Sequence, residues 1–107
     1  MALTRSYKIS ISERAQRDPE FAQALLDEAA TLFLNGEPEV ARIILRDLVN
    51  ATVGFEELAR ETEKPSKSLH RMLSAKGNPS MDNLAKIFSV IRTTLGVDME
   101  VHAVPVN

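Results

Sequence analysis

Apolar residues recur at intervals of three and four through most of the chain, which is the spacing of one face of an α-helix. Asp18 followed by Pro19 predicts a helix start, because the carboxylate can cap free amides and proline suits the first helical turn. This helix is expected to end near Asn35-Gly36. Glu37-Pro38 then predicts the start of a second, well-buried helix that stops at Gly54.

Three further helices are predicted at short intervals after this point. They run from about Phe55 to Thr62, from about Ser66 to Ser74, and from about Met81 to Leu95, with Ser80 as the N-cap of the last helix and Gly96 as its stop. The pattern therefore predicts a mainly α protein. We expect residues 1–107 to form a single domain of about five helices, in which residues 1–36 are an N-terminal extension.

The start of the chain carries two competing patterns. Residues 3–12 alternate between apolar and polar side chains, as a half-buried strand would. Ser10 and Glu13, however, have the spacing of a capping box for a short helix that runs to about Arg17. The sequence is thus compatible with a strand or with a short helix here, and the helix would add an N-terminal element to the bundle.

The end of the chain alternates more regularly. Val97, Met99, Val101 and Ala103 lie on one parity, and charged or polar residues occupy the other, which predicts a β-strand over 97–104. A single strand leaves backbone groups unpaired along its edges. We therefore expect it to pair with residues 3–11, with its own copy in a dimer, or with a partner protein.

Composition narrows the classes of function. The chain is 44% hydrophobic and 26% charged, as soluble globular domains are, and it has no apolar run long enough for a membrane span, so we expect a cytoplasmic protein. It has no cysteine, and its two histidines, His70 and His102, lie far apart and have no evident nucleophile partner. We accordingly expect no metal site, no cofactor and no enzymatic activity.

Charge is distributed unevenly although the net charge is only -2. Residues 13–39 contain seven acids and two bases, whereas residues 64–76 contain four bases and no acid. The basic window has the charge to face a polyanion while the acidic part faces elsewhere. A solvated helix face explains the same charges equally well.

The stretch from Phe55 to Leu73 has the spacing of a helix-turn-helix, with two short helices separated by three or four residues. Leu58 and Ala59 on the first helix are expected to face inward, as are Leu69, Met72 and Leu73 on the second. This leaves the outward face of the second helix to enter the major groove of DNA. The candidate residues for contact with base edges are Ser66, Lys67, Ser68, His70 and Arg71. The candidates for phosphate contact are Lys64, Lys76, Asn78 and Ser80.

At the level of residues, this segment resembles the Xre-type helix-turn-helix of phage lambda repressor and Cro. Four separated pieces extend the resemblance to the HigA-like probable addiction-module antidote proteins, over roughly residues 6–101. These pieces are Asp18-Pro-Glu-Phe21, Gly36-Glu-Pro-Glu39, Leu58-Ala-Arg-Glu-Thr62 and Gly77-Asn-Pro-Ser-Met81. The resemblance implies a lambda repressor-like bundle, a homodimer that binds operator DNA and represses its own operon, and an antitoxin that neutralises a small RelE/ParE-like toxin.

Three departures from the pattern of that family bear on DNA binding. Glu63 stands in the turn where glycine is usual, so a turn that keeps φ above zero costs on the order of 1 kcal/mol in strain. Glu56 and Glu57 place acids where small polar residues are common, and Pro65 replaces the usual serine cap. A protein-interaction module that has lost DNA affinity, or a free-standing phage-type repressor, is therefore the alternative to a DNA-binding antitoxin.

Overall fold

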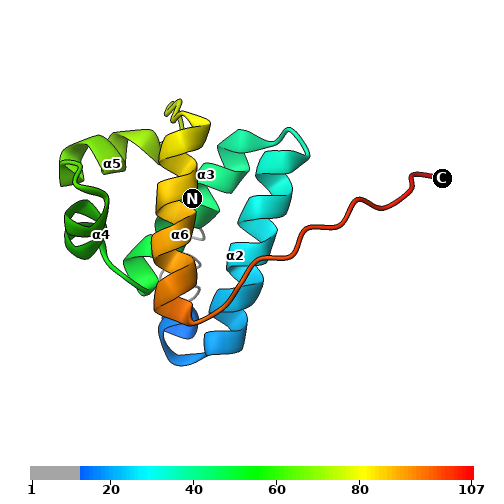
Figure 1. Ribbon diagram of the computed structural model, residues 1–107, viewed down its shortest axis with the longest axis horizontal. Coiled ribbons are helices and arrows are strands. Elements are labelled where there is room, and N and C mark those ends of the chain that lie inside the picture. The colour runs from blue at the N-terminus through cyan, green and yellow to red at the C-terminus, as the bar shows by residue number, and fades with distance from the viewer. Residues whose placement is uncertain (1–12) are drawn as a thin grey trace, which may run out of the picture.

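The computed structural model describes residues 13–107, and Figure 1 shows a bundle of helices from which the C-terminal segment runs away. Its full helices are α2 (Pro19–Leu34), α3 (Pro38–Ala51), α4 (Phe55–Thr62), α5 (Ser66–Met72) and α6 (Met81–Leu95). The prediction of a mainly α protein with five such helices is confirmed for this part of the chain.

Helix ends follow the capping residues. The Asp18 carboxylate accepts a hydrogen bond from the Phe21 N–H at 3.2 Å before α2, and the Ser80 hydroxyl accepts one from the Asn83 N–H at 3.1 Å before α6. Gly96 closes α6 in the left-handed region at φ 69°, which a glycine adopts without strain. The predicted bounds of α4 and α6 are confirmed. Helix α5, however, ends two residues before the predicted Ser74.

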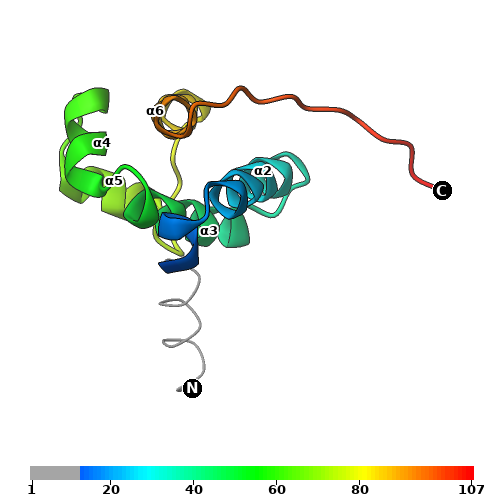
Figure 2. The same cartoon turned by 90° about the horizontal axis from the view of Figure 1, so that it is seen from below.

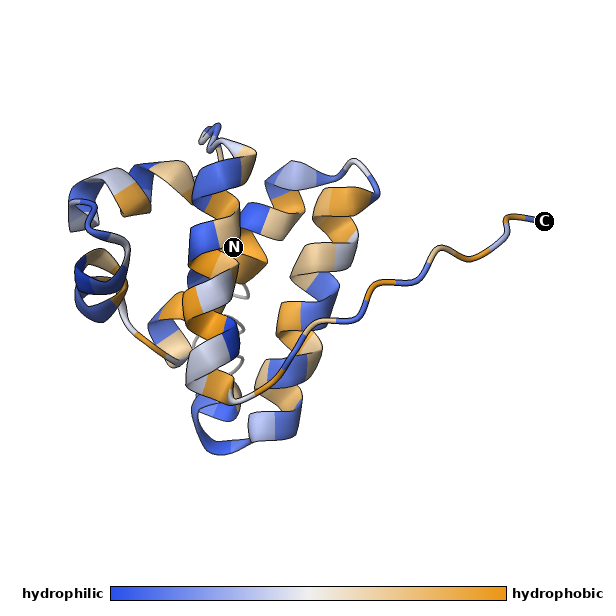
Figure 3. Cartoon of the chain, in the orientation of Figure 1, coloured by the Kyte–Doolittle hydropathy of each residue, from blue (hydrophilic) through white to orange (hydrophobic). Residues whose placement is uncertain are grey.

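Buried aliphatic residues join the helices into one core. Helices α2 and α3 lie side by side, α4 and α5 follow each other at one end, and α6 passes across the group (Figures 1 and 2). Hydrophilic residues predominate on α4, whereas hydrophobic residues recur on α2, α3 and α6 (Figure 3). The largest fully buried side chains are Leu26, Leu45, Leu48, Val49, Leu58, Leu69, Leu73, Ile87 and Ile91.

Residues 13–17 are helical, and the side chain of Ala15 is buried in the core. This agrees with the helix reading of the capping-box pattern over these five residues. The alternative strand over residues 3–12, and its possible pairing with the end of the chain, lie outside the described residues.

The predicted strand over 97–104 is not part of the fold of the single chain. Residues 97–107 form a trace that extends away from the helices (Figures 1 and 2), and no β-ladder is present within residues 13–107. Alternation of apolar and polar side chains gives a strand two different faces, but a ladder also needs a second backbone to pair with. None of the described residues supplies that backbone.

None of the helices in residues 13–107 combines the length and the apolar character that crossing a lipid bilayer requires.

Candidate nucleic-acid interface

Helices α4 and α5 pack against each other through buried side chains. Leu58 on α4 and Leu69 on α5 are fully buried, as is Leu73 directly after α5. Leu58 and Leu69 have the inward orientation expected from the sequence. Only residues 63–65 separate the two helices, so the turn is short enough to fix the direction of α5 relative to α4.

The turn keeps the backbone conformation that glycine favours, although glutamate occupies it. Glu63 lies at φ 56° and ψ 39°, and in residues 13–107 it is the one non-glycine residue with a positive φ. Lys64 then donates its backbone N–H to the Ala59 carbonyl at 3.1 Å, which closes α4. The strain expected at this position, on the order of 1 kcal/mol, is therefore present.

Helix α5 starts without a side-chain cap. Pro65 occupies the N-cap position in an extended conformation, and no side chain bonds to the free amides there. Its carbonyl accepts the Leu69 N–H at 3.2 Å, so α5 begins at Ser66, as the sequence predicted.

The outward face of α5 carries exposed cations. Lys67, His70 and Arg71 are exposed, while Ser66 and Ser68 are half-buried. Lys67 and Arg71 are four residues apart, one helical turn, so their side chains project from the same face. Neither forms an ion pair with any residue in the range 13–107. The structure thus brings two uncompensated cations together at the surface.

His70 has an aromatic contact that the sequence did not indicate. Its ring stacks on Phe55, the first residue of α4, with ring centroids 3.8 Å apart and planes inclined by 18°. Phe55 is itself buried, so one face of the imidazole is covered while the residue remains exposed as a whole. The stack ties the last turn of α5 to the start of α4, and it limits the directions in which His70 can reach a base.

The candidates for phosphate contact lie around α5. Lys64 is half-buried in the turn, and Lys76 and Asn78 are exposed between α5 and α6. The Ser80 hydroxyl is already used as the N-cap of α6, so only its other lone pair and its proton remain for a ligand. In addition, Asp82 places an acid in the first turn of α6, which opposes an anion at that helix start.

Arg42 fixes the position of the segment that follows α5. This α3 residue is only 7% exposed, and its guanidinium donates from Nε to the Ser74 carbonyl at 3.0 Å and from Nη2 to the Ala75 carbonyl at 2.8 Å. Sequence reasoning missed this residue, because a charge within an apolar helix stripe gives no indication of its partner.

Gly77 allows a close approach of the backbone in the same loop. A Cβ atom at this position would lie 2.2 Å from the Met72 carbonyl oxygen, so a larger residue would push the loop away from α5.

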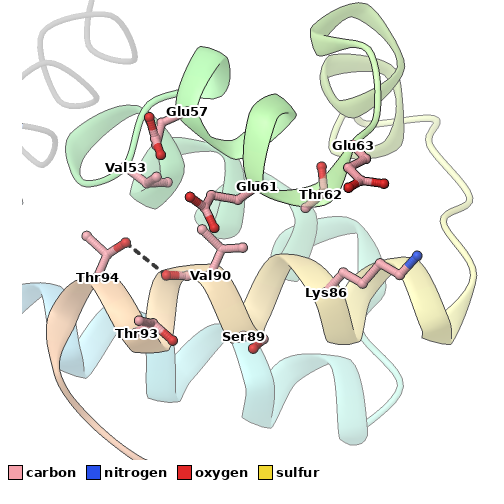
Figure 4. Close-up of a pocket in the computed structure, with 10 residues that line it drawn as sticks. All are labelled: Val53, Glu57, Glu61, Thr62, Glu63, Lys86, Ser89, Val90, Thr93 and Thr94. Atoms are coloured by element: carbon pink, nitrogen blue, oxygen red, sulfur yellow. Dashed lines mark hydrogen bonds between the residues drawn. The ribbon is translucent and has the colours of Figure 1, made fainter.

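Acidic side chains gather in a groove between α4 and α6. Glu57, Glu61 and Glu63 line this groove opposite Lys86 and a row of threonine and serine side chains on α6 (Figure 4). Glu57 also pairs with Arg60 one turn further along α4. Two of the three acids that the sequence placed near the DNA surface, Glu57 and Glu63, therefore line a groove shared with α6. Glu56 is exposed and does not line it.

Within residues 13–107, no group of three or more histidine, aspartate or glutamate residues is arranged to hold a metal ion.

No family model, curated protein or solved structure matches this chain. The described residues define an all-α bundle in which a short, two-helix unit presents uncompensated cations at the surface.

Proposed function

We propose that this protein binds double-stranded DNA, with α4 and α5 acting as a helix-turn-helix and α5 acting as the recognition helix. The observation that carries the proposal is the pair of exposed cations Lys67 and Arg71, which project together from α5 without an ion-pair partner in residues 13–107. Unpaired cations on a rigid helix favour a polyanionic ligand, since no existing ion pair has to be broken when the ligand binds.

Helix α5 suits the major groove, which is wide enough to admit one α-helix. Its inner side is fixed by Leu69, and its outer side carries Lys67 and Arg71, so the two cations can reach the groove without repacking the core. Arginine and lysine are the common donors to guanine O6 and N7. We assign these two residues to base edges, together with Ser66, Ser68 and the edge of His70.

The surrounding loops supply the contacts that position the helix on the duplex. Lys64, Lys76 and Asn78 lie in the turns on either side of α5 and suit phosphate oxygens. Ser80 is the weakest member of this set, because its hydroxyl caps α6 and Asp82 lies nearby.

We further propose that the protein is an antitoxin that represses its own operon and neutralises a RelE/ParE-like toxin. This part is supported by the resemblance of residues 6–101 to HigA-like antidote proteins. It is also consistent with the exposed acids of α2 and the start of α3, namely Glu20, Asp27, Glu28, Glu37 and Glu39, which suit a basic protein partner.

A second candidate function is a protein-interaction module without DNA affinity. The acids in the groove between α4 and α6 favour it, because Glu57, Glu61 and Glu63 add negative charge beside the proposed helix-turn-helix. DNA binding requires that the attraction of the α5 cations to the phosphate backbone exceeds the repulsion of the phosphates by these acids.

A promoter-binding titration separates the two candidates. The purified protein is titrated against its own promoter and against a shuffled duplex at two salt concentrations. Promoter-specific binding that weakens at the higher salt supports DNA recognition, because phosphate contacts release counterions. An absence of binding at both salt concentrations would refute it and favour the interaction module.

Alanine variants then test the assigned face. Lys67→Ala and Arg71→Ala should each lose about 1–3 kcal/mol of promoter affinity without unfolding the protein. Lys86→Ala is the matched control, since this exposed cation faces the groove on α6 rather than the outer side of α5. Equal losses in all three variants would indicate non-specific attraction and contradict the assignment of α5.

If a small basic protein is encoded beside this gene, the antitoxin role is tested by co-expressing that protein with this chain. Growth arrest by that protein should be relieved by the wild-type chain and by the Lys67→Ala/Arg71→Ala double variant alike. A neighbour that arrests growth and is not neutralised would refute the antitoxin role. A neighbour without toxicity would favour a free-standing repressor.

A further inference from the structure

We propose that the tail, residues 97–107, is a dimerisation strand that pairs antiparallel with the tail of a second copy about a two-fold axis at Val101. The tail has two contrasting faces, an unused backbone edge, and a glutamate and a histidine at matching positions. This inference goes beyond the proposed function, because it names the occupant of a surface that DNA binding does not involve.

The odd-numbered residues of the tail form an uninterrupted apolar face from Val97 to Pro105. Val97 and Met99 pack against the core, and Val101 lines an apolar groove with Phe33 and Phe88. Ala103 and Pro105 continue the same parity. The tail therefore begins with its apolar face on α2 and α6, and its polar face begins with the exposed residues Asp98 and Glu100.

Backbone hydrogen bonds determine which edge of the tail is free. Val97 donates its N–H to the Arg92 carbonyl at 3.1 Å and accepts from the Arg92 guanidinium at 3.3 Å, so its backbone groups point toward the end of α6. In an extended chain, successive residues point their backbone groups to opposite edges. The other edge is therefore presented by residues 98, 100, 102 and 104, and none of these makes a backbone hydrogen bond within residues 13–107.

Pro105 agrees with this assignment of edges. Proline lacks a backbone N–H and is tolerated in a strand where that position faces away from the partner. Pro105 has the parity of Val97, so it lies on the edge that a partner strand would not use.

The complementarity of the glutamate and the histidine selects one register. Antiparallel pairing about Val101 puts Glu100 opposite the partner's His102, and by symmetry His102 opposite the partner's Glu100. Pairing about residue 100 would oppose two glutamates, and pairing about residue 102 would oppose two histidines. A shift by one residue would mix the apolar and polar faces. Within one chain, Glu100 Oε1 and His102 Nε2 already lie 3.8 Å apart on the same face.

The resulting two-stranded ribbon has a place to pack. Its apolar face would continue across the groove lined by Phe33, Phe88 and Met81, and it would do so on both copies. A lone two-stranded ribbon is marginally stable in water, but packing on helices stabilises it. Val101, which is 65% exposed in the single chain, would become the centre of the interface.

Single-cysteine variants test the register directly, since the natural chain has no cysteine. Opposed Val101 residues in a non-hydrogen-bonded pair would have Cα atoms about 4.5 Å apart, within disulfide range. Val101→Cys should therefore form a linked dimer on mild oxidation, at least about tenfold faster than Val106→Cys, whose copies lie far from the axis. Met99→Cys should link efficiently only when mixed with Ala103→Cys, because the two Met99 positions lie about 13 Å apart along the ribbon.

A charge exchange tests the pairing without cysteine. Sedimentation equilibrium should show weaker dimers for Glu100→Lys and for His102→Glu alone, and a tighter heterodimer when the two variants are mixed, because the new lysine then faces the new glutamate. A chain ending at Glu100 keeps Val97, Met99 and the Arg92–Asp98 ion pair, and it should be a folded monomer by circular dichroism and sedimentation.

Several outcomes would overturn the proposal. These are a wild-type chain that stays monomeric, a dimer that survives truncation at Glu100, equal cross-linking at all four cysteine positions, or a mixture no tighter than its components. None of these results bears on α5, whose DNA contacts are measured separately through Lys67 and Arg71.

Discussion

The α4–α5 unit and the tail contain equally clear sequence patterns, yet only one of them forms regular structure within the chain. Helices α4 and α5 bury Leu58 and Leu69 completely, whereas the tail leaves Val101, Val104 and Val106 between 65% and 95% exposed. Both segments lie at the periphery of the bundle, on different sides of it (Figure 1).

The difference follows from where each element finds its hydrogen-bond partners. A helix satisfies its backbone internally, so an apolar stripe and a neighbouring core suffice to form it. A strand satisfies its backbone only with a second strand, and the described chain offers none to the tail. The apolar periodicity of one segment is therefore enough to predict a helix. It does not suffice to predict a strand, which also needs a second strand to pair with.

The largest expected effect contrasts one buried and one exposed aliphatic residue. Leu69→Ala should lower the free energy of unfolding by about 2–5 kcal/mol, because it empties a fully buried site between α5 and the core. Val104→Ala in the tail should change it by less than about 0.5 kcal/mol. Urea denaturation followed by circular dichroism, at a concentration where the protein is monomeric, measures both. Similar losses in the two variants would mean that the tail is part of the folded core.

A smaller effect is expected from the buried guanidinium that anchors the loop after α5. Arg42→Met should cost about 2–3 kcal/mol, since the Ser74 and Ala75 carbonyls lose a charged donor in a part-buried place. Arg60→Met is the matched control, because within residues 13–107 this exposed arginine pairs only with Glu57, and it should cost no more than about 1 kcal/mol. The denaturation midpoints of the two variants measure the difference. Equal midpoints would contradict the anchoring role of Arg42.

The smallest predicted effect has the opposite sign. Glu63→Gly should stabilise the protein by up to about 1 kcal/mol, because glycine adopts φ 56° without the steric cost of a Cβ atom. Glu61→Gly, two residues earlier and inside α4, should destabilise it by about 0.5–1 kcal/mol. Melting temperatures that move in the same direction for both variants would show that the left-handed turn stores no strain.

Most of the fold could be predicted from local signals. The capping residues Asp18 and Ser80, and Gly96 as the stop, gave helix ends that agree with the structure within a residue or two. The end of α5 was predicted two residues late, because Leu73 remains buried after the helix has ended and therefore extends the apolar pattern. The strand could not be decided locally, since its formation depends on a partner backbone.

The candidate site was predictable only in part, for the same physical reason. The exposure of Lys67 and Arg71 follows from the apolar positions of α5, and the short turn before α5 follows from the spacing of the two helices. The stack of His70 on Phe55, the burial of Arg42 and the groove that collects Glu57 and Glu63 are tertiary contacts. No spacing within one helix specifies such contacts, because each depends on how two elements meet.

The stack of His70 on Phe55 also makes the proton NMR signals of the two histidines distinguishable. Protons of an imidazole that lies over a phenyl ring are shielded by its ring current, so the His70 resonances are expected upfield of their usual position. The only other histidine, His102, lies in the exposed tail, and no aromatic ring among residues 13–107 stacks on it. Two resolved histidine signals in a proton NMR spectrum would thus follow separately the α4–α5 pair and the tail, and with them the two proposed interactions.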